Sequence, residues 1–217
     1  MSVQIGVLAL QGDFEAHRRA LDRAGAEASE IRTAADLEKV DGLVLPGGES
    51  TTMLKLLNEE GMLEPLRAFG RSKPIFGTCA GIILLASEVL NPAQESLGLM
   101  DLTIERNGYG RQVDSRIAQI EVGGEKTEAV FIRAPVVRRT GSAVKVLATY
   151  AETPVLLEQG RHLAATFHPE LSAKPEIHEY FVQKVKAQAM QSVSSDTLGE
   201  KQSTEISEQA EKLPTQK

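Results

Sequence analysis

The single cysteine of the chain occupies a position suited to a reactive side chain. Cys79 stands between two apolar runs, Pro74–Phe76 and Ile82–Ala86, with Gly77 and Gly81 two residues to either side. A lone cysteine is most often a small buried apolar residue, but such a residue does not need flanking glycines, which weaken strands and helix starts. A strand, a tight glycine turn and a helix are the parts of a nucleophile elbow. The positive end of that helix would favour the reactive thiolate.

A cysteine nucleophile of the acyl-transfer type needs a base to take and return a proton, and a third group to orient that base. His168 and Glu170 follow the short apolar stretch Leu163–Phe167, which we predict to be a strand. In an extended segment, side chains two residues apart point to the same side, so these two can hydrogen-bond. Glu170 would then fix the imidazole tautomer and stabilise its charged form. The sequence therefore predicts a triad of Cys79, His168 and Glu170.

The other three histidines are less suited to this role. His17 lies in a polar stretch of helical character, where a solvated face is expected. His162 follows Gln159, Gly160 and Arg161 in a predicted hairpin turn, and His178 lies among charges in the last predicted helix. One cysteine and scattered histidines form no recognisable ligand spacing, so we expect no metal and no cofactor.

Two segments together carry a resemblance: GTCAG at 77–81 and FHPE at 167–170. They resemble the triad-type class I glutamine amidotransferase family. Further segments resemble one branch of that family, the glutaminase subunit of pyridoxal 5'-phosphate synthase. The resemblance extends from about Val3 to Lys186, and these further segments are residues 6–12, 45–52, 105–107, 110–115 and 131–135.

The resemblance implies a reaction and a partner. The protein would hydrolyse L-glutamine to L-glutamate and ammonia through a thioester on Cys79, with His168 and Glu170 completing the catalytic set. The ammonia would pass to the synthase subunit within a hetero-oligomer, because free ammonia is mostly protonated in water. We expect the face around Leu10–Gly12 and the turn at Gly47 and Gly48 to meet that subunit.

Substrate recognition can be predicted in part from the chemistry. Attack on the side-chain carbonyl creates an oxyanion, for which we assign the Ala80 amide and one amide from Gly47 or Gly48. A plain turn with a helix cap at Ser50 would fit the same residues. Arg106 and Arg133 present donor forks suited to a carboxylate. The resemblance implies that the residues in contact with glutamine are Gly48, Glu49, Ser50, Arg106, Ile132 and Arg133.

Two other classes of function stay open. A hydrolase or redox-stress protein could use the Cys79 elbow without a histidine–glutamate pair. A non-catalytic partner-binding module would use none of these residues chemically. Amidotransferases that feed nucleotide or amino-acid synthesis are closer rivals in chemistry, but the five branch-like segments disfavour them.

Composition fits one soluble domain. The 217 residues, 41% hydrophobic and 25% charged, can bury one core. The net charge of −6 argues against a general nucleic-acid surface. The apolar run Val3–Leu10 is too short for a membrane span and has no basic leader, so we expect neither export nor insertion. A single cysteine suits a reducing cytoplasm.

Apolar runs alternate with helical patterns along the chain, which predicts an α/β fold with a parallel sheet. The resemblance implies a three-layer, doubly wound, flavodoxin-like arrangement with antiparallel edge strands. The turn at 46–50 should then lie beside the elbow at the carboxyl edge of the sheet, where such folds bind ligands. Predicted helices are 14–24, 51–58, 62–69, 81–90 and 176–189. Predicted strands are 3–10, 42–46, 74–78, 102–105, 117–122, 129–132, 144–150, and a hairpin of 155–157 with 163–167.

The composition changes near the C-terminus. Residues 191–217 contain almost no large apolar side chains and cannot bury a core. We therefore predict an amidotransferase domain at residues 1–190 and a polar tail at 191–217 that is disordered or weakly helical.

Overall fold

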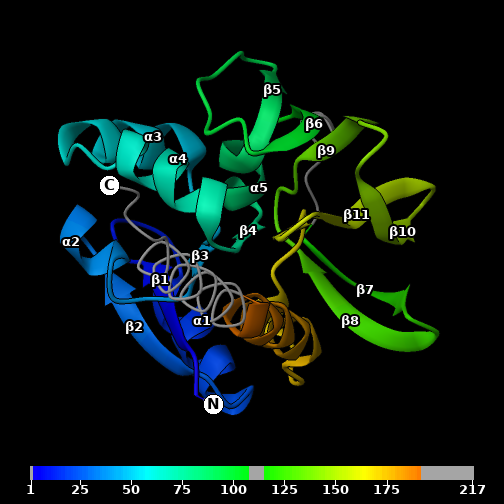
Figure 1. The fold of residues 1–217 in the computed structure, drawn as a ribbon. Helices are drawn as coiled ribbons and strands as arrows, with labels where there is room; N and C mark the ends of the chain where they lie inside the picture. The colour runs from blue at the N-terminus through cyan, green and yellow to red at the C-terminus, as the bar shows by residue number, and fades with distance from the viewer. Residues whose placement is uncertain (1, 108–114, 192–217) are drawn as a thin grey trace, which may run out of the picture.

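A seven-stranded sheet forms the centre of the molecule in the computed structural model, which describes residues 2–107 and 115–191 (Figure 1). The strand order is β10-β11-β12-β4-β3-β1-β2. Five neighbouring strands are parallel, whereas β10 and β11 pair antiparallel at one edge. The predicted sheet is thus confirmed. Its strands are β1 (Gln4–Leu8), β2 (Glu27–Ile31), β3 (Gly42–Leu45), β4 (Ile75–Thr78), β10 (Lys145–Tyr150), β11 (Thr153–Gln159) and β12 (His162–Ala165).

Helices cover both faces of this sheet and form the two outer layers of a three-layer fold (Figure 1). One face packs against side chains such as Met53, Leu66 and Ile82, and the other against side chains such as Leu21 and Phe181. Strands β3 and β4 are buried at every residue, as expected where both faces of a parallel sheet are covered. The helices are α1 (Phe14–Arg23), α2 (Ala34–Leu37), α3 (Ser50–Glu59), α4 (Leu63–Ser72), α5 (Ala80–Leu85), the 3₁₀ turn η1 (Pro169–Leu171), and residues 176–191.

Two small sheets lie beside the central one. The first has the order β5-β6-β9, and the second is the hairpin β7-β8. Only the predicted strand at 144–150 joins the edge of the central sheet, as β10. The stretches predicted as strands at 102–105, 117–122 and 129–132 instead satisfy their backbone hydrogen bonds within the small sheets. These strands are β5 (Ala86–Leu90), β6 (Met100–Glu105), β7 (Arg116–Val122), β8 (Glu125–Phe131) and β9 (Val136–Thr140).

The helix predicted for residues 81–90 is wrong in its second half. Helix α5 ends at Leu85, and the chain continues as β5, which pairs in parallel with β6. The Ser87 hydroxyl donates to the carbonyl of Leu102 at 3.0 Å, and Val89 is buried. Pairing with a strand from later in the chain therefore overrides the local helical pattern.

Some predictions concern residues outside the described ranges. These are residues 110–114 of the segment 110–115, and residues 192–217 of the tail, so the boundary at 190 stays a prediction. Among the described residues, no helix is both long and apolar enough to cross a membrane.

Candidate active site

Cys79 lies between β4 and α5 with φ 49° and ψ −102°, a backbone conformation that residues other than glycine rarely adopt. Its backbone N–H donates to the carbonyl of Ala165 on the adjacent strand β12 at 2.9 Å. The flanking glycines are required by close approach. A Cβ at Gly81 would lie 2.2 Å from the carbonyl oxygen of Leu45, and one at Gly77 would lie 2.6 Å from the carbonyl of Gly81. The predicted elbow geometry is therefore present at Cys79.

His168 and Glu170 meet as the sequence predicted, but through a different backbone. Strand β12 ends at Ala165, and Glu170 belongs to the 3₁₀ turn η1 rather than to an extended segment. The turn brings Glu170 Oε1 to 2.7 Å from His168 Nδ1. The backbone N–H of His168 donates to the carbonyl of Val130 in β8 at 2.8 Å, which ties this segment to the hairpin.

Cys79 and His168 interact directly. Burial alone would lower the pKa of His168, but the hydrogen bonds and negative charges of Cys79 and Glu170 outweigh it and raise that pKa to about 10. The raised pKa keeps the imidazole a cation between Cys79 and Glu170. Cys79 Sγ also lies 3.8 Å from the carbonyl oxygen of Ile132, a residue predicted to contact substrate.

The turn after β3 packs against this pair. A Cβ at Gly47 would lie 2.4 Å from Cε1 of His168 and 3.2 Å from the Cβ of Cys79. Gly48 has φ 142°, which is unfavourable for any side chain. Only glycines allow this backbone to approach the reacting groups so closely.

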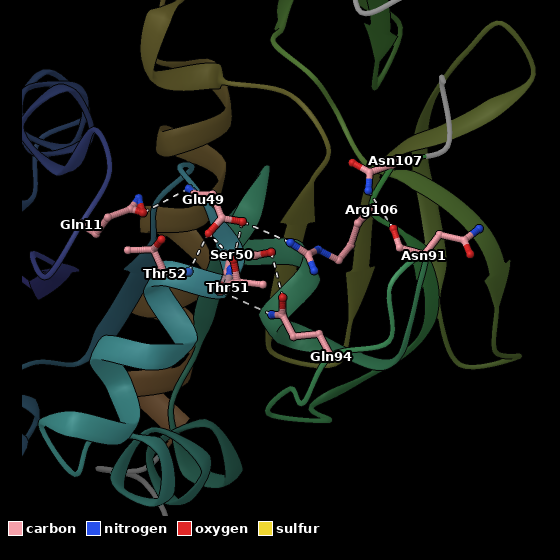
Figure 2. Close-up of polar contacts among 9 residues, drawn as sticks. All are labelled: Gln11, Glu49, Ser50, Thr51, Thr52, Asn91, Gln94, Arg106 and Asn107. Atoms are coloured by element: carbon pink, nitrogen blue, oxygen red, sulfur yellow. Dashed lines mark hydrogen bonds and ion pairs between the residues drawn. The ribbon is translucent and has the colours of Figure 1, made fainter. Parts of the chain in front are cut away.

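Glu49 caps helix α3, so the alternative cap at Ser50 is wrong. Its carboxylate accepts from the backbone N–H of Thr51 at 3.2 Å and of Thr52 at 2.7 Å, while its own N–H donates to Oε1 of Gln11 at 3.1 Å (Figure 2). Partial burial raises the pKa of Glu49, but the hydrogen bonds from Thr51 and Thr52 prevail and lower it to about 2. Glu49 is therefore an anion throughout the physiological pH range.

The residues around Glu49 form what we call the rim cluster: Glu49, Ser50, Gln94 and Arg106. Figure 2 shows the Arg106 guanidinium reaching Glu49, where Nη2 lies 3.1 Å from Oε1. The Ser50 hydroxyl donates to Oε1 of Gln94 at 3.0 Å. Next to the cluster, Asn107 donates to the carbonyl of Asn91 at 2.8 Å. The segment after β5 thus supports the outer side of the site.

A cavity of about 220 Å³ opens between the rim cluster and Cys79. Nine of the predicted site residues line it: Gly48, Glu49, Ser50, Cys79, Ala80, Arg106, Ile132, Arg133 and His168. Gly47 packs against His168, and Glu170 lies behind it, so both belong to the site without lining the cavity. The sequence prediction did not include three lining residues, which are Ile83, Asn107 and Pro135.

The expectation that His17 lies on a solvated face is wrong, because His17 is fully buried, and so is His178. With Thr78 and Glu170 they form what we call the rear cluster, on the side of His168 away from the cavity. The signal was present in the spacing. His17 lies three and four residues before the buried Ala20 and Leu21, and His178 lies three residues before the buried Phe181. Charged neighbours concealed both patterns.

His162 was also misplaced, because it begins β12 rather than lying in the hairpin turn. It is buried, and its Nδ1 accepts from the backbone N–H of Ile75 at 3.3 Å. Burial is the main reason that its pKa falls to about 4. Its hydrogen bond is to the backbone of β4 rather than to Cys79, His168 or Glu170, and we assign it a structural role.

A cysteine at a strand–helix elbow, with a histidine–glutamate pair just after the neighbouring strand, has the arrangement of a thiol-dependent acyl-transfer site. The chain belongs to the SNO glutamine amidotransferase family, which its sequence matches over residues 7–187. Among the described residues, no group of three or more histidine, cysteine or acidic side chains could hold a metal ion.

Curated relatives extend this assignment. The chain is 54% identical over 190 residues to a pyridoxal 5'-phosphate synthase subunit PdxT of Solibacter usitatus, covering 84% of this chain and 99% of the relative. It is 50% identical over 186 residues to the protein of that name in Koribacter versatilis, covering 85% and 96%. A solved glutamine amidotransferase is 48% identical with a TM-score of 0.80, covering 84% of this chain and 98% of that one.

A more distant structure shows the fold alone. It is described as a putative GMP synthase subunit from Thermoplasma acidophilum, and it has 16% identity and a TM-score of 0.63. The match covers 90% of this chain and 98% of that one.

Proposed function

We propose that the protein hydrolyses L-glutamine to L-glutamate and ammonia, and supplies the ammonia to the synthase subunit of pyridoxal 5'-phosphate synthase. The observation that carries the proposal is the interaction of Cys79 with a His168 that is bound to Glu170, at the wall of a cavity. Family membership and the names of the curated relatives support this choice of substrate and partner. We propose that residues 1–190 form the glutaminase domain.

The residues present account for each bond change. The Cys79 thiolate attacks the side-chain carbonyl carbon of glutamine and forms a tetrahedral intermediate. The His168 imidazolium gives its proton to the departing nitrogen, so ammonia leaves and a glutamyl thioester remains. The neutral His168 then takes a proton from water. The resulting hydroxide adds to the thioester, and collapse of the second intermediate releases glutamate and regenerates the thiolate.

The oxyanion of both intermediates needs backbone donors. Ala80 is the first residue of α5, so its N–H has no partner within the helix, and it lines the cavity directly after Cys79. The close packing of Gly47 against the reacting pair supports an N–H of Gly47 or Gly48 as the second donor. Donors fixed at this position are usually the largest single contribution to such catalysis.

The amino-acid end of glutamine would be held at the other side of the cavity. We assign its carboxylate to Arg106 and Arg133, and its ammonium group to the Glu49 carboxylate, with Ser50 and Ile132 completing the contacts. The Glu49–Arg106 ion pair keeps both charges in place before substrate arrives. Glutamine would then exchange part of this pair for its own two charges.

Ammonia transfer implies a docked partner. The loop at Gln11 bonds to the segment that carries Glu49, which supports the residues 10–12 and the 47–48 turn as the synthase-facing side. We place the resulting hetero-oligomer in the cytoplasm, where a protein with one unpaired thiol stays reduced.

The proposal is tested by ammonia release from glutamine, measured for the purified protein with and without the synthase subunit. We expect synthase-stimulated release that Cys79→Ala reduces by at least about a thousandfold. Cys79→Ala should still bind the synthase, which controls for folding. Absence of release in every mixture, or full activity of Cys79→Ala, would overturn the proposal.

A further inference from the structure

Glu170 has a second neighbour besides His168. Its Oε2 lies 3.2 Å from Nε2 of His17, and both side chains are fully buried. The same Nε2 lies 3.0 Å from the Thr78 hydroxyl, and Nδ1 of His17 lies 2.9 Å from Nε2 of His178. Glu170 Oε2 has no hydrogen-bond partner among the described residues, so His17 Nε2 is the polar group that lies against it at ion-pair distance. A chain of buried polar groups therefore leads from the C-terminal helix to the triad.

The directions of the hydrogen bonds can be assigned. One of the two facing nitrogens of His17 and His178 must carry the proton. If His17 carried it on Nδ1, its Nε2 lone pair would face the Glu170 carboxylate, and His178 would keep a buried N–H on Nδ1 with no partner. Buried N–H groups without a partner are rarer than unpaired acceptors. We therefore assign the His178 Nε2–H as donor to His17, and the His17 Nε2–H as donor to the Thr78 hydroxyl, with its positive end 3.2 Å from Glu170 Oε2.

Both histidines are neutral in this arrangement. Burial is the main cause that lowers the pKa of His17 well below its usual value, and the neighbouring His178 and His168 add to it. Burial likewise lowers the pKa of His178 to about 3. A cationic His17 would neutralise Glu170, whereas a neutral donor directs the carboxylate and leaves its charge to His168.

We propose that His17 is a positioning residue that orients Glu170 toward His168, and that His178 fixes the tautomer in which His17 does so. No atom of either histidine lines the cavity, so their effect on turnover is transmitted through Glu170. The inference rests on the proposed glutaminase function, but its effect on the reactivity of Cys79 can be measured separately.

Two amides of different length test the donor. In His17→Gln the amide nitrogen can reach the position of Nε2, whereas in His17→Asn it reaches only that of Nδ1. We expect His17→Asn to lower synthase-stimulated turnover by about 10-fold or more, with an unchanged KM, and His17→Gln to stay within about 3-fold of wild type. The matched control is His162→Asn, the same change at a buried histidine outside the site.

A second readout does not require turnover. Cys79 is the only thiol, so iodoacetamide labelling reports on one site. Weaker support of the His168 cation by Glu170 should move the midpoint of the labelling rate to higher pH by about one unit in His17→Asn. His17→Gln and His162→Asn should keep the wild-type midpoint. A purely structural role would lower the thermal stability and leave the midpoint in place.

The outcomes separate the two proposals. If both His17 variants match wild type, or both lose turnover without a shifted midpoint, the positioning role is overturned. A shifted midpoint in His17→Asn, in a protein that releases no ammonia with its synthase, would support the positioning role and overturn the glutaminase proposal. Ring-nitrogen NMR of the wild type adds a test without a variant. A proton on Nδ1 of His17 would overturn the assignment.

Discussion

The rim cluster and the rear cluster hold opposite sides of one site by opposite means. On the rim, the Glu49 and Arg106 side chains are 50% and 12% exposed, and a full ion pair joins them. In the rear, His17 and Glu170 are completely buried, and the neutral His17 lies against the carboxyl group that pairs with His168. Exposed ion pairs are weak and exchangeable, whereas buried polar groups are costly to disturb. Substrate can therefore rearrange the rim, and the rear keeps the reacting groups fixed.

In this comparison the largest effect is expected from removing the charge of Glu170, which contacts both His168 and His17. Glu170→Gln keeps the size of the side chain but removes the carboxylate that stabilises the His168 cation. We expect turnover to fall by about 100-fold with little change in KM. Steady-state ammonia release would measure it.

The control for that variant is Glu158→Gln. Glu158 also bonds two side chains, Tyr180 at 2.6 Å and Lys184 at 2.8 Å, but on β11, away from the cavity. It should keep its turnover. A Glu170→Gln enzyme with normal turnover would show that the rear cluster does not act on the reaction.

As the pH falls, the buried histidines of the rear cluster should lower the unfolding free energy before Glu49 of the rim loses its charge. The folded state keeps His178 neutral down to a pKa of about 3, while the unfolded chain protonates it near 6.5. The unfolded state thus binds more protons below pH 6.5, and each buried histidine of this kind lowers the unfolding free energy by roughly 1.4 kcal/mol per pH unit. Glu49, with a pKa of about 2, loses no charge in this window.

Urea unfolding between pH 5 and 6.5 would measure this slope. His178→Gln removes one titrating group, so we expect a shallower dependence than in the wild type. The contribution of His168 to the pH dependence of the unfolding free energy has the opposite sign. Because its pKa is raised to about 10, its stabilising contribution is complete below pH 6.5 and is lost as the pH rises through 10. Equal slopes for wild type and His178→Gln would contradict the neutral state of His178.

A smaller effect is expected at the rim. Arg106→Gln removes the cation proposed to bind the substrate carboxylate, so KM for glutamine should rise about 10-fold while turnover changes by less than about 3-fold. Initial rates over a range of glutamine concentrations separate the two constants. Arg138→Gln, which breaks an ion pair with Glu105 on the small sheet, is the control. Lost turnover at unchanged KM would place Arg106 in the chemical step instead.

The smallest effect is expected from Gln94→Ala. Its hydrogen bond joins two neutral groups, the buried Ser50 hydroxyl and the half-buried Gln94 amide, and such a bond is worth about 1 kcal/mol. We expect KM to rise by no more than about 3-fold in the same assay. An effect as large as that of Arg106→Gln would mean that the rim is a rigid unit, and the contrast with the rear would fail.

The site was predictable where chemistry and local backbone agree. Gly77 and Gly81 marked the elbow because close approach excludes any side chain there, and the short spacing of His168 and Glu170 marked their contact. The turn that joins them was not predictable, since η1 depends on tertiary contacts. His17 was missed because one residue in a charged helix can still lie on the buried face.

The fold shows the same limit. Buried strands such as β3 and β4 could be predicted from their continuous apolar sequence. The edge strand β2 could not be predicted in this way, because three of its five residues are polar and only Ile31 is buried. Its pairing with β1 defines it. Strand β5 was taken for helix for a related reason: its partner β6 comes later in the chain.

The backbone at Cys79 has a consequence for how this protein could evolve. A φ of 49° with a ψ of −102° suits glycine, and holding any other residue there costs on the order of 1–3 kcal/mol. Cys79→Gly would therefore fold more stably than Cys79→Ala, although both lack the thiol. Selection for a robust fold and selection for a working enzyme favour different residues at this one codon, so a lineage released from the reaction would be expected to lose its cysteine early.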